Sequence, residues 1–246
     1  MALMRTSNPA LNENAFRIDA LSGEAMTLSG TVNKTGILLI CVIATAAWSW
    51  NRFLTAPENA LPLLGVGAIG GFIVALVTIF KKEWAPVTSP IYALLEGLVL
   101  GSISALYEAR FHGIVFQAVG LTFGTLLALL LAYRSGVIKA TENFKLGVVA
   151  ATGGIAVFYL VELVLGFFGI RFAAINGGGG IGIGFSIFVV IIAALNLVLD
   201  FDFIENGVRS SAPKYMEWYA AFGLMVTLIW LYLEILRLLS KVRSRR

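Results

Sequence analysis

Four acidic residues lie inside long apolar stretches of this chain, where a bilayer would surround them with hydrocarbon. They are Glu96 in YALLEGLVLG, Glu162 in FYLVELVLG, Asp200 in AALNLVLDFDFIE and Glu234 in WLYLEILR. A charged side chain at the bilayer centre costs on the order of 3 kcal/mol on insertion scales, so such residues usually face the bundle interior or water. These four acids are therefore the first candidates for a functional site.

The chemistry open to these acids follows from the absence of a partner in the sequence. No lysine or arginine lies deep in an apolar stretch. Carboxyl groups without a cation beside them hold a proton, share one or bind a cation. Calcium needs several oxygen ligands, which carboxylates and loose backbone carbonyls can supply. The pattern predicts proton sensing or cation conduction, and the alternative for each acid is a protonated packing residue.

Asp200 is the strongest candidate, because Asn196 lies one turn earlier and gives the helix a polar stripe. Its alternative is a position at a helix end near the lipid headgroups. Glu234 has Arg237 three residues later, so a local ion pair on the helix surface is its alternative. Further acids lie at the ends of the apolar stretches, where interfacial water reaches them: Glu108, Asp202 and Glu205. Glu217, at the start of the last stretch, is open to either interpretation.

Metal and nucleophile chemistry has little support in the residue types. The chain has one cysteine, Cys41, and one histidine, His112, which excludes a disulfide framework or a zinc cluster within one chain. Nothing resembles the serine–histidine pair, the two intramembrane aspartates or the zinc motif of an intramembrane protease. The GGGG run follows no strand and precedes no Lys-Ser or Lys-Thr pair, so it predicts no phosphate loop. We expect no enzyme activity, no metal ligands and no cofactor.

Seven apolar runs separated by short polar breaks predict seven transmembrane helices. Hydrophobic residues make up 59% of the 246-residue chain and charged residues 13%, whereas a soluble domain carries roughly a quarter charged residues. Each run approaches the ~20 residues that a helix needs to cross the hydrocarbon core, and lipid excludes open strands and loops. The runs are Gly36–Leu54, Leu61–Phe80, Pro90–Tyr107, Ile114–Tyr133, Leu146–Phe168, Ile181–Phe203 and Tyr215–Leu239.

The predicted fold is an all-α bundle of seven transmembrane helices over residues 36–240. A polar tail over residues 1–35 precedes it, and a basic tail over residues 241–246 follows. Glycines four residues apart let helix backbones approach closely, and we expect packing within the molecule at three such pairs. They are Gly67 with Gly71, Gly97 with Gly101, and Gly120 with Gly124.

Lysine and arginine near the span ends predict the orientation. The N-terminal tail and the second, fourth and sixth loops hold ten of them, and the other three loops hold Arg52, Arg110 and Arg171. This places the N-terminus in the cytoplasm, and seven crossings then place the basic C-terminus outside. The alternative is a last segment that enters the membrane and returns, but we expect seven crossings.

Three segments carry a family resemblance: SNPALNENAF, FIVALVTIFKKEWAPVTSPIYALLEGLVLGSI and LDFDFIEN at the end of the sixth run. Together with the seven spans, they resemble the Bax inhibitor-1 family and its bacterial YccA-like members over nearly the whole chain. The resemblance implies six helices around the last one. It also implies a pH-sensitive calcium leak sensed by an aspartate pair on the sixth and seventh helices, and a link to a membrane protease in bacteria.

The resemblance places the sixth-helix aspartate at Asp200, with Asp202 as a rival. The seventh-helix position falls on Thr227, which cannot ionise, and Glu234 is the nearest acid, two turns further along. Asp200 is expected near a helix end and Glu234 about twenty residues into the next helix, roughly 30 Å apart in depth. We therefore expect no contact between these two acids unless the last helix is tilted or broken.

Two functions remain open. The first is a slow, pH-regulated calcium leak in a bacterial plasma membrane, with Asp200 as sensor and Glu96, Glu162 or Glu234 as further acids. The second is a non-conducting bundle that binds other membrane proteins, such as a quality-control protease, through its polar N-terminal tail. Lipid and calcium ions are expected partners. The net charge of +4 is attributed to membrane orientation, so no nucleic acid is expected.

Overall fold

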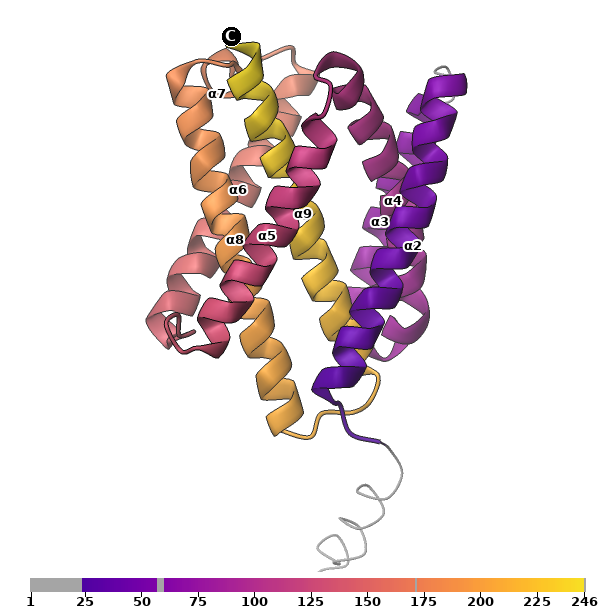
Figure 1. Ribbon diagram of the computed structural model, residues 1–246, viewed down its shortest axis with the longest axis vertical. Helices are drawn as coiled ribbons and strands as arrows, with labels where there is room; N and C mark the ends of the chain where they lie inside the picture. Colours follow the sequence, from indigo (N-terminus) through magenta and orange to yellow (C-terminus); the bar gives the residue numbers. More distant parts are fainter. Residues whose placement is uncertain (1–23, 57–59, 171, 246) are drawn as a thin grey trace, which may run out of the picture.

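Seven long helices run side by side in the computed structural model (Figure 1), which describes residues 24–56, 60–170 and 172–245. Each is long and apolar enough to cross a membrane, which confirms the predicted all-α class. A short 3-10 turn, η3 (Lys82–Trp84), and a short helix, α7 (Ala173–Asn176), lie between them. The long helices are α2 (Leu28–Thr55), α3 (Ala60–Phe80), α4 (Ala85–Arg110), α5 (Ile114–Arg134), α6 (Glu142–Phe167), α8 (Gly180–Arg209) and α9 (Met216–Ser244).

Several helices extend beyond the apolar runs at their polar ends. α2 begins at Leu28 rather than at Gly36, because the Thr27 side chain caps its first turn by accepting from the Gly30 amide at 3.0 Å. α9 continues to Ser244, through the residues expected to form a basic tail. Apolar composition marks the part of a helix inside hydrocarbon, whereas backbone hydrogen bonding carries the helix on until a cap or turn ends it.

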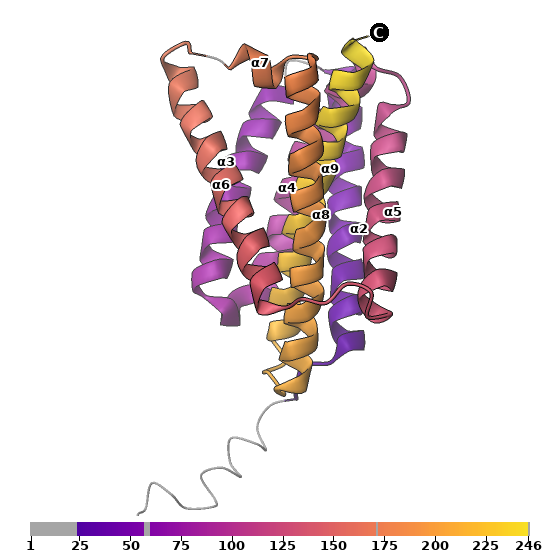
Figure 2. The same cartoon turned by 90° about the vertical axis from the view of Figure 1, so that its left-hand side faces the viewer.

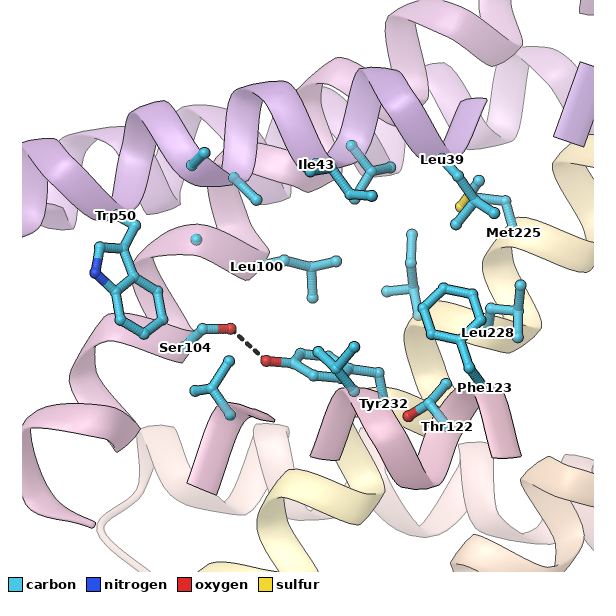
Figure 3. A pocket seen from close by; sticks show the side chains of 17 residues that line it. Leu39, Ile43, Trp50, Leu100, Ser104, Thr122, Phe123, Met225, Leu228 and Tyr232 are labelled. Carbon is cyan, nitrogen blue, oxygen red and sulfur yellow. Dashed lines mark hydrogen bonds between the residues drawn. The ribbon is translucent and has the colours of Figure 1, made fainter. Parts of the chain in front are cut away.

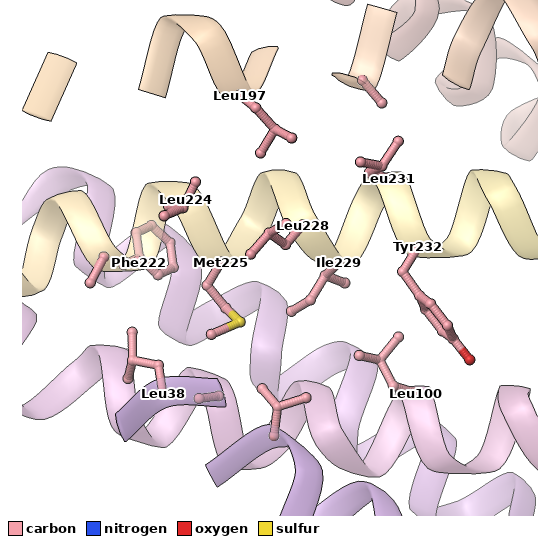
Figure 4. Packing of buried hydrophobic residues seen from close by; sticks show 14 of the residues in the cluster. Leu38, Leu100, Leu197, Phe222, Leu224, Met225, Leu228, Ile229, Leu231 and Tyr232 are labelled. Atoms are coloured by element: carbon pink, nitrogen blue, oxygen red, sulfur yellow. The ribbon is translucent and has the colours of Figure 1, made fainter. Parts of the chain in front are cut away.

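The last helix, α9, is central, as expected. It packs against α2, α4, α5 and α8 and is one continuous helix, so the alternative of a segment that enters and returns is not found. Figures 1 and 2 show it crossing the bundle obliquely, with its C-terminus at the end opposite the start of α2. Its apolar side chains form about half of the core (Figure 4), and Leu231 and Leu236 are fully buried there.

Close packing of α4 against α2 depends on glycine. A Cβ atom at Gly97 would overlap Thr45 and the α2 backbone, and one at Gly101 would overlap the backbone of Ala46. A side chain at either position would push the two helices apart. This pair of glycines therefore packs within the molecule, as predicted.

The other two glycine pairs differ from each other. A Cβ atom at Gly67 would lie 2.8 Å from a backbone oxygen of α4, and one at Gly71 would lie 2.9 Å from the Glu96 carboxylate, so this α3 pair also packs internally. Gly120 and Gly124 on α5 have no atom within 4 Å of that point. The predicted internal packing was wrong for α5, because glycine spacing alone does not reveal which helix face meets a neighbour.

Candidate functional site

Asp200 lies on the face of α8 that packs against the central helix α9. α8 continues to Arg209, so Asp200 lies ~14 Å before the helix end at 1.5 Å per residue, which argues against the headgroup alternative. Its Oδ2 atom is inaccessible to solvent and has no hydrogen-bond partner. Among the described residues, no other buried side-chain nitrogen or oxygen is left in this state. An unpartnered buried acceptor costs on the order of 1–3 kcal/mol, so its presence calls for an explanation.

Gly223 and Thr227, one turn apart on α9, face the Asp200 carboxyl group. A Cβ atom at Gly223 would lie 4.0 Å from Asp200 Oδ1, and the Thr227 hydroxyl lies beside the same carboxyl group. That hydroxyl donates to the Gly223 carbonyl at 3.3 Å, a long hydrogen bond. A threonine hydroxyl has one proton, so rotation about its Cβ–Oγ1 bond can direct that proton either to the Gly223 carbonyl or to the Asp200 carboxyl group.

The resemblance had placed the second member of an aspartate pair at Thr227, and this side chain does lie beside Asp200. One carboxyl group and one hydroxyl therefore stand where two carboxyl groups were implied. Two carboxyl groups in contact titrate as a coupled unit, whereas a single one titrates alone. The chemistry available here is the uptake of one proton or the partial coordination of one cation.

Glu234 lies further along α9 and faces α6. It is 2% exposed, accepts from the Tyr159 hydroxyl at 3.0 Å and pairs with Arg237 at 3.1 Å. The Arg237 guanidinium also donates to the Tyr159 hydroxyl at 2.6 Å. Glu234 is seven residues beyond Thr227, or ~10 Å of helix, so the expected depth of 30 Å from Asp200 was too large. The error arose because Asp200 was placed near the end of its helix, whereas α8 continues nine residues beyond it to Arg209.

Glu96 faces α3 rather than α9. Its carboxylate lies next to Gly71 and beside the Tyr92 hydroxyl, one turn earlier on α4. The Tyr92 ring packs edge-on against Phe222 of α9 at 4.9 Å between ring centroids. Glu96 thus lies at the contact between α3 and α4, whereas the Tyr92 ring reaches α9.

Glu162 and Asp202 lie at opposite ends of the bundle. Glu162 accepts a hydrogen bond from Asn176 of α7. Asp202 faces α6, where its Oδ2 is 2.8 Å from Lys145 Nζ and accepts from Asn206 at 2.9 Å. Both acids have local partners, and neither meets Asp200.

Asn196 does not form a stripe with Asp200. Its amide nitrogen donates to the Thr152 hydroxyl of α6 at 2.7 Å and to the carbonyl of Ile192 at 2.9 Å. Side chains four residues apart are rotated by about 40° around a helix, and here that rotation separates the α6-facing Asn196 from the α9-facing Asp200. Thr227 is the polar neighbour of Asp200 instead.

Within the described residues, no group of three or more His, Cys, Asp or Glu side chains could hold a metal ion. A cation at Asp200 would have to complete its ligands from the Thr227 hydroxyl, backbone carbonyls and water. Hard cations accept such oxygen ligands, but sites with one carboxylate bind them weakly.

A family model described as Bax inhibitor 1 like matches residues 8–244. The chain belongs to the Bax inhibitor 1 like family. None of the curated proteins compared with it matches the chain. The resemblance to the Bax inhibitor-1 family is therefore confirmed, and the Asp200–Thr227 pair belongs to a Bax inhibitor 1 like protein.

One acid of this Bax inhibitor 1 like chain had been left aside at a span end. Glu217, in the first turn of α9, is fully buried and accepts from both the amide and the hydroxyl of Thr27 at 2.8 Å. It also pairs with Lys34 of α2 and, at 3.3 Å, with Lys214. Lys214, three residues before Glu217, could have indicated an ion pair from the sequence. The partners Thr27 and Lys34 could not be predicted, because they come from a distant segment.

A second residue missed by sequence reasoning is Lys241, expected in a basic tail. It is 5% exposed and donates to the carbonyls of Ile175 and Gly182 at 2.8 and 3.2 Å and to the Ser186 hydroxyl at 2.8 Å. All three ammonium protons are thereby used. Lys241 therefore fastens α7 and the start of α8 to the central helix.

Proposed function

We propose that this Bax inhibitor 1 like protein is a slow, pH-sensitive calcium leak in which Asp200 is the proton-sensing residue. The observation that supports it is the unpartnered Oδ2 atom of Asp200 beside the central helix. A neutral carboxyl group is tolerated in such a place, whereas an ionised one needs a donor, water or a cation. A change in the protonation of Asp200 therefore changes whether the contact between α8 and α9 must include a donor, a water molecule or a cation.

The neighbourhood of Asp200 supports a switch between two arrangements. With Asp200 protonated, the Thr227 hydroxyl keeps its bond to the Gly223 carbonyl. With Asp200 ionised, the same hydroxyl rotates to donate to the carboxylate, and a cation or water satisfies the remaining oxygen. Because α9 contacts four other long helices, a displacement of α9 at Thr227 is passed on to the centre of the bundle.

The test is calcium flux from loaded liposomes that contain the purified chain, measured at about pH 6 and pH 8, either side of neutrality. The native chain should leak at a rate that depends on pH, and Asp200→Asn should leak without that dependence. Asp202→Asn is the matched control, because Asp202 is paired with Lys145 on the opposite side of α8. Flux no greater than from empty vesicles at both pH values would overturn the proposal.

A second function, binding of other membrane proteins without conduction, is favoured by the anchoring of the N-terminal segment. Ala25 forms a β-bridge with Pro213, and the Met26 amide donates to the Ala212 carbonyl at 2.7 Å. These bonds hold residues 25 and 26 against the connection between α8 and α9, and residues 1–23 lie outside the part of the chain that the structure describes. If residues 1–23 recruit a membrane protease, deleting them should abolish crosslinking to the protease, and liposomes with the native chain should leak no more calcium than empty vesicles.

We propose that the bundle end with Lys34 and Lys214 faces the cytoplasm of a bacterial plasma membrane, so that the C-terminus lies outside. The basic C-terminus had argued against this side. Two of its cations are engaged within the protein, since Arg237 pairs with Glu234 and Lys241 bonds to α7 and α8. Ser244→Cys in a Cys41→Ser background should react with an impermeant thiol reagent from outside intact cells, and labelling only after lysis would reverse the assignment.

A further inference from the structure

An apolar groove of 460 Å³ runs along the bundle axis between α2 and α5 (Figure 3), with α4 and α9 as its floor. The α2 residues that line it extend from Leu39 to Trp50, ~16 Å of helix at 1.5 Å per residue. Its polar side chains are Ser104, Thr122 and Tyr232. The groove is thus long, narrow and almost entirely hydrocarbon-lined.

The groove is open to the lipid-facing surface. Ile43 on its α2 rim is 59% exposed, and Val119 and Phe123 on its α5 rim are 39% and 37% exposed. On the floor, Leu228 and Ile229 of α9 are buried. Apolar cavities of this kind do not hold water. In a bilayer, the material at the mouth of the groove is hydrocarbon.

The form of the groove, narrow and ~16 Å long, favours one class of apolar occupant. One extended acyl chain has the necessary narrow and elongated form.

The hydroxyl groups of Ser104 and Tyr232 form a polar point in the otherwise apolar groove, at the end near Trp50 (Figure 3). Their hydroxyl oxygens are 2.6 Å apart and both side chains are buried. One hydrogen bond uses one of the two hydroxyl protons, so the second proton is available to an acceptor in the groove. A chain that carries an ester carbonyl near its polar end matches this arrangement, and a plain hydrocarbon does not.

The end of the bundle beyond Trp50 is basic. Its described acids are already engaged: Glu108 accepts from amides at the start of α5, Glu162 from Asn176, and Glu234 pairs with Arg237. The remaining cations there favour an anionic headgroup. They lie at the ends of α2, α4 and α9 and are Arg52, Arg110, Arg243 and Arg245, whereas Arg237 and Lys241 are engaged within the protein.

We propose that the groove holds one acyl chain of an anionic phospholipid, whose ester carbonyl accepts from the Ser104–Tyr232 hydroxyl pair and whose headgroup lies at the basic end. The bound lipid would fill the gap between α2 and α5 and contact the central helix directly. The site is distinct from Asp200, which meets α9 from α8.

The first test fills the groove. Full-length protein is equilibrated with vesicles of phosphatidylethanolamine and phosphatidylglycerol, released in mild detergent and analysed by native mass spectrometry for retained lipid. Ala47→Phe places a ring in the groove from α2, and Ala156→Phe places the same ring on the exposed face of α6. Retained phosphatidylglycerol should fall roughly tenfold in Ala47→Phe, equivalent to ~1.4 kcal/mol, and stay at the native level in Ala156→Phe.

The second test removes the polar point and the headgroup charge separately. Tyr232→Phe keeps the ring and should reduce retention roughly threefold, as expected for one hydrogen bond. Replacing phosphatidylglycerol by phosphatidylcholine should reduce retention in the native chain, and a plain alkane of the same chain length, which has no acceptor, should not compete. Equal retention by native, Ala47→Phe and Ala156→Phe chains would overturn the proposal. So would loss of a protein dimer, rather than of lipid, in Ala47→Phe.

Discussion

Glu217 and Asp200 are both acids at the central helix. Glu217 lies in the first turn of that helix, and Asp200 contacts it from α8. Glu217 receives two hydrogen bonds from Thr27 and pairs with Lys34 and Lys214. Asp200 has the Thr227 hydroxyl beside it, and its Oδ2 atom has no partner among the described residues. The first carboxylate is fully compensated by its surroundings, and the second is not.

This difference separates a structural acid from a candidate functional one. A carboxylate with two cations and two donors is held ionised and in place, and it ties α2 to α9. A carboxyl group with one neutral neighbour can exchange its proton at small cost to the fold. Burial of an acid therefore does not identify function by itself; the number and charge of its partners does.

The largest effect is expected when the compensated acid is changed. Glu217→Gln leaves Lys34 without its counter-ion and weakens both bonds from Thr27, so the free energy of unfolding should fall by about 3 kcal/mol. Thermal unfolding in detergent micelles, followed by circular dichroism, measures this. Glu24→Gln is the control, because Glu24 pairs with Lys214 at an exposed position and should change stability by less than about 0.5 kcal/mol. Equal stability of the two variants would show that Glu217 does not tie the helices.

The next largest effect is expected from restoring a second acid beside Asp200. Thr227→Asp would place two carboxyl groups in contact in the α8–α9 interface, with a cost of about 2 kcal/mol when both are ionised. Two such groups titrate as a coupled pair, so stability and calcium flux should change over a wider pH interval than in the native chain. Thr227→Asn introduces a side chain with the shape of aspartate but without its charge. In this variant, stability and calcium flux should change over the same pH interval as in the native chain.

A smaller effect is expected from neutralising Asp200 itself. Asp200→Asn supplies an amide that can donate to a backbone carbonyl, so the free energy of unfolding should rise or stay within about 1 kcal/mol of the native value above neutral pH. Loss of several kcal/mol would instead place Asp200, like Glu217, among the structural acids. The measurement is the same thermal unfolding, carried out on both sides of neutrality.

The membrane helices and the position of the site could be predicted because both depend on local signals. Apolar runs long enough to span a bilayer fixed seven helices, and the LDFDFIEN segment pointed to Asp200. The resemblance that placed the second member of an aspartate pair at Thr227 also located the α9 residue beside Asp200. These inferences needed the order of residues along the chain and no knowledge of which helices are neighbours.

The partners of the other acids could not be predicted, because they come from distant segments. Glu217 is bonded to Thr27 and Lys34, and Lys241 to carbonyls at Ile175 and Gly182, contacts that exist after α9 has packed in the centre. The depth of Asp200 was misjudged for a related reason. The apolar run ends at Phe203, but intrahelical hydrogen bonds continue α8 to Arg209. Asp200 therefore lies further from the helix end than the apolar run indicated.

The smallest effect is expected at Asp202, the other aspartate of the LDFDFIEN segment. Its pair with Lys145 lies on a partly exposed surface between α6 and α8, where such pairs contribute roughly 0–1 kcal/mol. Asp202→Asn should therefore lower the free energy of unfolding by less than about 1 kcal/mol. It should also leave the pH dependence of calcium flux unchanged, because the substituted side chain faces α6 and not the α8–α9 contact. A loss of pH dependence in Asp202→Asn equal to that in Asp200→Asn would move the sensor from the interior contact to the surface pair.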